Sequence, residues 1–253
     1  IPFDYPVVAT TAQAGEFVLC PPREWIDKGF EKGGDKTTFI YYGAKMLEPG
    51  KEESKVKRLS GSEMVVPNAM IVPMPKGETA EPGDVLLTRW QSGSGMQRAI
   101  VVEGGSPTEP KIRYLDIDYD NPSGAGKKVD TCKPDTFYKI SKEFEVGTAV
   151  AAKSRFGWKR WKIVGLAGDK VLALGFAGKM TVLKKADCVA LPVKPSVKEG
   201  DEAYVPYIGS MKKGTVKKID AAIGRVFTEI EFGGKKKEVA APFGDVIAEL
   251  PAK

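Results

Sequence analysis

The sequence contains no histidine, the side chain that most often serves as a general base, a transition-metal ligand or a switch near neutral pH. Catalytic dyads and triads that depend on histidine are therefore excluded. A structural zinc site without histidine normally needs four cysteines, and the chain has three, Cys20, Cys132 and Cys188. They are widely spaced without a Cys-x-x-Cys pair, so we expect partly buried thiols, at most one disulfide bridge, and no cofactor.

Long hydrophobic runs are also missing. No apolar segment approaches the roughly 18 residues that span a bilayer, and no signal peptide is recognisable. The chain begins at Ile1 rather than Met, so we expect that something preceding it was removed, and its compartment stays open. The 28 glycines and 18 prolines are scattered between apolar runs, which indicates frequent turns rather than a disordered tail.

A phrase that begins with a glycine and an apolar strand occurs four times. The phrases open at 14–20, 82–90, 146–153 and 199–207, with Gly15, Gly83, Gly147 and Gly200. Each phrase closes with an apolar strand, a kink and a second apolar strand, at 64–75, 133–140, 180–192 and 237–251. Basic-apolar strands and Gly-bearing turns lie between the opening and closing parts. The chain is therefore predicted to be an irregular internal repeat.

Short strands with period-two alternation predict an all-β fold. In the last copy Val226, Thr228 and Ile230 fall on one face. Spacings of about ten residues between Gly-bearing turns favour small barrels or sandwiches, and about five strands per copy are too few for a large sandwich. We expect four small units that pack on one another, at 1–78, 79–141, 142–194 and 195–253. The first would also contain one short helix within 21–34 and an exposed charged loop at 47–63.

The segment 81–102, EPGDVLLTRWQSGSGMQRAIVV, resembles Tudor, agenet and related SH3-like barrel repeats. Segments 146–164 and 199–219 repeat its glycines and strands, and the resemblance extends more loosely to 15–75. It implies tandem small SH3-like or Tudor-like barrels that bind peptides or nucleic acid, often through an aromatic cage at the barrel mouth. The aromatic residues that would contribute are Trp90, Tyr114 and Tyr119 in the second unit, Phe156, Trp158, Trp161 and Phe176 in the third, and Tyr204, Tyr207 and Phe232 in the fourth.

Positive charge is concentrated in the third unit. Residues 141–195 carry eleven Lys and Arg against four Asp and Glu, a net charge of +7 in a chain whose total is +6. The segment 153–162 interleaves cations with aromatic rings, through Arg155, Phe156, Trp158, Lys159, Arg160, Trp161 and Lys162. Such a pattern suits an anionic ligand, including nucleic acid, an anionic glycan, an acidic peptide or a membrane surface. It also suits a solvated strand face whose tryptophans pack between units.

Three aspartates at alternate positions, Asp116, Asp118 and Asp120, form the one candidate metal motif. The calcium-loop pattern needs Gly at its sixth position and Glu at its twelfth, where this chain has Asn121 and Lys127. We therefore expect an acidic face that pairs with Lys or Arg rather than a metal site. Paired carboxylates can also serve hydrolysis, which nothing else in the chain supports.

The sequence favours a non-catalytic binding or scaffolding protein whose partner is a protein or peptide. One alternative is a structural subunit of a larger assembly, on or outside the cell, that uses Met64, Met70, Ile71 and Met74 as an exposed interface. A second is a binder of nucleic acid or another polyanion through the third unit. The remaining alternative is an enzyme that uses Asp and Lys.

Overall fold

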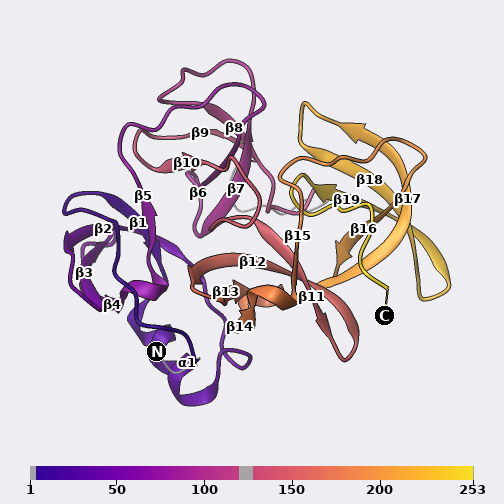
Figure 1. The fold of residues 1–253 in the computed structure, drawn as a ribbon. Helices are drawn as coiled ribbons and strands as arrows, with labels where there is room; N and C mark the ends of the chain where they lie inside the picture. The colour runs from indigo at the N-terminus through magenta and orange to yellow at the C-terminus, as the bar shows by residue number, and fades with distance from the viewer. Residues whose placement is uncertain (1–3, 120–127, 253) are drawn as a thin grey trace.

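Antiparallel strands form three sheets in the computed structural model, which describes residues 4–119 and 128–252 (Figure 1). The all-β prediction is confirmed, with one α-helix among the described residues, α1 (Arg23–Lys32). The first sheet contains β1 (Phe17–Cys20), β2 (Tyr42–Glu48), β3 (Glu53–Arg58), β4 (Glu63–Pro67) and β5 (Val72–Met74). The second contains β6 (Val85–Arg89), β7 (Met96–Val101), β8 (Lys111–Tyr114), β9 (Val129–Thr131) and β10 (Phe137–Lys139).

The third sheet is the largest, with nine strands. They are β11 (Ala149–Ser154), β12 (Gly157–Ala167), β13 (Lys170–Leu174), β14 (Met180–Lys184), β15 (Cys188–Ala190), β16 (Glu202–Tyr207), β17 (Ser210–Asp220), β18 (Arg225–Phe232) and β19 (Lys235–Pro242). Three short 3-10 helices are η1 (Asn68–Met70), η2 (Phe176–Gly178) and η3 (Lys185–Asp187). Among the described helices, none is long and apolar enough to cross a membrane.

The strand order repeats four times. The first sheet runs β5-β1-β2-β3-β4 and the second β10-β6-β7-β8-β9, so the last strand of each set lies beside the first. Within the third sheet, β15-β11-β12-β13-β14 follows the same order, and β16-β17-β18-β19 follows it with a single bridge from Tyr204 to Ile247 as the fifth member. We name these sets the first to fourth units. The third and fourth are joined by one register pair, Lys159 with Ser210.

The glycine that opens each unit occupies the same tight turn. Gly15, Gly83, Gly147 and Gly200 have φ of 86°, 90°, 97° and 90°, a region that other residues rarely adopt. Each glycine N–H donates to a carbonyl on the second strand of its unit at 2.8–2.9 Å; the acceptors are Met46, Val101, Ile163 and Val216. The same four residues return a hydrogen bond to the residue after each glycine. The sequence repeat therefore records a repeated backbone requirement.

The helix α1 forms where Pro22 precedes it and Gly33 ends it, with Ile26 fully buried. Gly29 lies inside the helix, where glycine ordinarily costs stability. A Cβ atom at this position would lie 2.4 Å from Cζ of Phe39. The glycine therefore lets the Phe39 ring pack directly on the helix backbone.

Two expectations for the first unit are wrong. The segment 47–63 is not a charged loop, because it contains β3, whose Ser54 and Val56 are buried while the alternating Lys55 and Lys57 are half-buried and exposed. The strand was not predicted because charged residues alternate along its outer face and make the segment resemble a solvated loop. Of the four residues expected at an exposed interface, Met70, Ile71 and Met74 are buried in this chain's own core and Met64 is half-buried.

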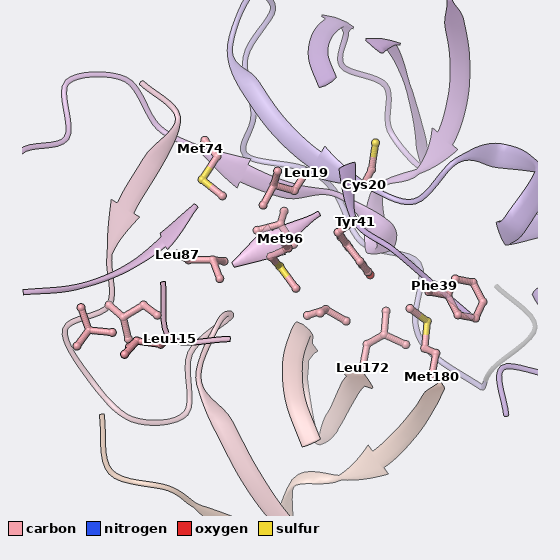
Figure 2. Packing of buried hydrophobic residues seen from close by; sticks show 14 of the residues in the cluster. Leu19, Cys20, Phe39, Tyr41, Met74, Leu87, Met96, Leu115, Leu172 and Met180 are labelled. Carbon is pink, nitrogen blue, oxygen red and sulfur yellow. The ribbon is translucent and has the colours of Figure 1, made fainter. Parts of the chain in front are cut away.

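One hydrophobic cluster extends through all four units, so they pack on one another as expected. Figure 2 shows Leu19 and Tyr41 of the first unit, Met96 of the second and Leu172 of the third around a shared interior. The Phe39 N–H donates to the Gly178 carbonyl at 2.8 Å, which fastens the first unit to the third. One smaller cluster lies in the second unit, one in the third, and one between the third and fourth. The relative placement of the units therefore rests on buried apolar surface.

Candidate binding site at the junction of three units

Strand β12 divides the predicted basic stretch between two faces. Trp158, Arg160 and Lys162 alternate with Lys159 and Trp161, so the two groups point in opposite directions. Trp158 packs with Ala149, Leu191 and Met211, and Trp161 packs with Val150, Ile163 and Val171. Both tryptophans are half-buried. Arg155 and Phe156 lie apart from them at the exposed β11–β12 hairpin, with the guanidinium carbon 4.5 Å from the ring centroid.

Arg160 and Lys162 enter a buried group of charges that we call the junction network, made of Arg98, Asp116, Arg160, Lys162 and Asp245. Asp116 follows β8 and lies at the centre of the network. Its Oδ1 accepts from Nη2 of Arg98 at 2.7 Å and from Nε at 3.0 Å. Its Oδ2 accepts from the Arg98 backbone N–H at 2.8 Å and from the Lys162 ammonium. One carboxylate thus joins the second unit to the third.

Asp245 brings the fourth unit into the same network. Its Oδ1 accepts from Nε and Nη2 of Arg160, both at 3.0 Å, and lies 3.0 Å from Nη2 of Arg98. Nη1 of Arg98 donates to the Phe243 carbonyl at 3.2 Å. The Arg98 side chain is only 2% exposed, so its charge depends on these partners.

Burial and neighbouring charges act against each other on the pKa values of the network. Burial alone would raise the pKa of Asp116, but Arg98, Lys162 and Arg160 hold it well below its usual range. Burial lowers the pKa of Lys162, and although Asp116 raises it, Arg98 and Arg160 lower it further, to about 8. The surroundings of this amine therefore disfavour its charged form.

A further cation, Arg225 at the start of β18, lies at the same junction. Its Nη2 donates to the carbonyls of Ile117 at 2.8 Å and Tyr114 at 3.2 Å, and Nη1 donates to Ala240 at 3.3 Å. Its Nε is buried and has no hydrogen-bond partner among the residues that the structure describes. Burial lowers the pKa of this guanidinium. Arg225 thus connects the second and fourth units without a carboxylate of its own.

Arg225 and every member of the network except Arg98 line a cavity of about 340 Å³, which we call the junction cavity. Three units line it: the second through Leu115–Asp118, the third through Arg160, Lys162, Leu174–Phe176 and Gly178, and the fourth through Pro206, Gly209, Arg225, Val239–Pro242 and Asp245. Phe176 is 62% exposed at this cavity. The site therefore combines buried charge with an exposed aromatic side chain, a lining typical of small binding pockets.

The other predicted aromatic residues are distributed over several places. Trp90 packs edge-to-face on the buried Tyr114, with centroids 6.0 Å apart, and lines a separate cavity of about 210 Å³ with Tyr42 and Arg58. Tyr119 packs on Phe227, and Tyr204 belongs to the apolar cluster around Trp158. Tyr207 packs on Phe232 at 4.9 Å, and the Lys237 ammonium lies 4.7 Å from its centroid. Of all the aromatic residues predicted from the sequence, Phe176 is the one that lines the junction cavity.

The three aspartates of the candidate metal motif do not form a common site among the described residues. Asp116 serves the ion pairs with Arg98 and Lys162, Asp118 is exposed at the cavity, and Asp120 lies outside the described residues. Among the residues that the structure describes, no group of three or more His, Cys, Asp or Glu side chains is placed to hold a metal ion. The three cysteines are free, and burial raises the pKa of Cys20 and Cys132 to about 12, which makes their thiolates scarce.

Arg98, Arg225 and Asp245 belong to the junction and were missed in the sequence. Arg98 offered a signal, because it stands between Met96 and Ile100 on the inward face of an apolar strand, where a charge needs a buried partner. Asp245 and Arg225 stand in or beside turns, where charged residues are common and carry no such signal.

A comparison with models of known protein families finds no match, and a comparison with curated proteins finds none. The site must therefore be interpreted from its own geometry.

Proposed function

We propose that this chain is a non-catalytic binding or scaffolding protein, built from tandem SH3-like units, that holds a protein or peptide partner at the junction cavity. The observation that carries the proposal is the meeting of three units around one cavity, where ion pairs between them hold the units together. A rigid, preformed site loses little conformational entropy on binding. The SH3-like assignment is supported by the strand order that recurs in all four units.

The geometry gives less support to the alternatives. A polyanion needs accessible cations along an extended face, whereas Arg160 and Lys162 lie together at a cavity that has room for single groups. The exposed interface expected for a structural subunit is not formed by the predicted residues, because Met70, Ile71 and Met74 are buried in the core. An enzyme that uses Asp and Lys would need an unpaired acid or amine, but Asp116 and Lys162 form an ion pair with each other.

A random peptide library displayed on phage tests the proposal when it is selected against the purified chain. Selected synthetic peptides should bind the chain and should bind more weakly after Phe176→Ser, because Phe176 is the exposed aromatic residue at the cavity. Phe156→Ser is the matched control, since Phe156 is similarly exposed on a distant hairpin. The proposal is wrong if no peptide is enriched, or if both substitutions weaken binding equally.

A further inference from the structure

Positive charge exceeds negative charge inside the junction. Four cations lie there. The side chains of Arg98, Arg160 and Lys162 are at most 17% exposed, and Arg225 is buried. Two carboxylates, Asp116 and Asp245, face them from within the network. The third acidic residue at the cavity, Asp118, is exposed at its margin, where water weakens its effect on the buried cations without removing it. An uncompensated buried cation is costly, and a bound anion would remove that cost.

Two cations that line the cavity from β12, Arg160 and Lys162, have donors that the described residues leave unused. Nε and Nη2 of Arg160 bind Asp245, but Nη1 donates to none of the described residues. The Lys162 ammonium has three N–H groups and makes one hydrogen bond among the described residues, to Asp116. A guanidinium edge and an ammonium on one strand, two residues apart, can both donate to a single group.

We infer that the junction cavity is an oxyanion site that takes one carboxylate or phosphate group between Arg160 and Lys162. The inference rests on the proposed function and names the chemistry that a partner would present there. Charge-assisted hydrogen bonds from buried donors are the strong ones, because little water competes for them. The exposed Phe176 and the neighbouring Pro206 offer apolar surface to whatever carries the anion, which favours an acidic peptide side chain over inorganic phosphate.

Titration calorimetry with two probes tests the inference: inorganic phosphate and the blocked tripeptide acetyl-Gly-Glu-Gly-amide. The glutamine counterpart of the peptide is the uncharged control. The glutamate peptide should bind, phosphate should compete with it, and the glutamine peptide should bind at least about tenfold more weakly, since charged hydrogen bonds are lost. Phosphate that binds more tightly than the peptide would identify free phosphate as the source of the oxyanion.

Two substitutions on β12 separate the site from general positive charge. Arg160→Gln should weaken the glutamate peptide about tenfold or more, because it removes a donor and a charge. Lys159→Gln, the neighbouring residue on the opposite face, should leave affinity unchanged. Because Arg160→Gln also removes an ion pair with Asp245, a third variant is needed that leaves the network intact. Asp118→Asn at the exposed margin should strengthen binding about threefold by removing a repelling charge.

The outcomes distinguish this inference from the proposed function. Equal affinities for Arg160→Gln and Lys159→Gln, no gain for Asp118→Asn, or no heat from either probe up to about 1 mM would overturn the oxyanion site. If library-selected peptides still bind in excess phosphate, the proposed function stands and the oxyanion site fails. If phosphate binds and Arg160→Gln weakens its binding, while the glutamate peptide gives no heat and no library peptide is enriched, the oxyanion site stands and the peptide-binding function fails.

Discussion

Replacing Asp245 with alanine should destabilise the protein by about 3 kcal/mol, at the lower end of the range for breaking a buried ion pair. Asp245 is 7% exposed and accepts from Arg160 and Arg98, both at 3.0 Å. Without it, Arg98 still has Asp116, and Arg160 is 17% exposed and can reach water, which is why we choose the lower end. Asp245→Ala leaves the guanidinium groups of Arg98 and Arg160 close together, with Asp116 as the one carboxylate of the network that remains.

Urea denaturation followed by tryptophan fluorescence measures this loss as a change in the free energy of unfolding. Asp220→Ala is the control, because Asp220 in the same unit makes a surface ion pair with Lys218 at 3.5 Å and should cost less than about 1 kcal/mol. A double-mutant cycle with Arg160→Ala should give a coupling energy of about 1 kcal/mol or more. The reasoning is refuted if Asp245→Ala costs no more than Asp220→Ala, or if the coupling is zero.

Three further changes test other parts of the structure. Gly83→Ala and Gly200→Ala should each lower the free energy of unfolding, measured in urea, by about 1–2 kcal/mol. The reason is that φ near +90° disfavours alanine, whereas the added Cβ atom would meet open space. An unchanged free energy of unfolding in either variant would contradict the need for glycine in these turns. Gly29→Ala should destabilise by about 1–3 kcal/mol through overlap with Phe39, and a gain in melting temperature, which helix propensity alone predicts, would contradict this packing. The pKa of Lys162 is about 8 when folded against its usual 10.5, so the unfolded chain binds more protons between these values. The free energy of unfolding should therefore rise, relative to Lys162→Met, from pH 8 to 10.5 and stay level relative to it below pH 8; a flat difference up to pH 10 would count against a buried amine.

The repeat was predictable because it depends on local backbone requirements. A glycine needed for φ near +90° cannot be replaced freely, so Gly15, Gly83, Gly147 and Gly200 mark equivalent turns in the sequence itself. The alternation of Val226, Thr228 and Ile230 likewise marks the buried face of β18, and all three are at most 1% exposed. Strand β3 was missed because Glu53, Lys55 and Lys57 occupy its solvent face, and because its inward face carries a single buried apolar side chain, Val56.

The junction cavity was predictable only in part. Arg160 and Lys162 stood out through local charge, and Asp116 through its alternating aspartates. The pairing of Arg98 with Asp245, 147 positions later, depends on how the second and fourth units pack, which no local pattern encodes. For the same reason the aromatic residues assigned to one cage per unit turned out to pack in different places: periodicity fixes the face of a strand but not what covers that face.

A crystal structure of the chain with the glutamate tripeptide tests the central claim most directly, since it locates the bound group. We expect the glutamate carboxylate in the junction cavity, with one oxygen within about 3.2 Å of Nη1 of Arg160 or Nζ of Lys162. A carboxylate bound at another surface, with the cavity holding water alone, would contradict the account.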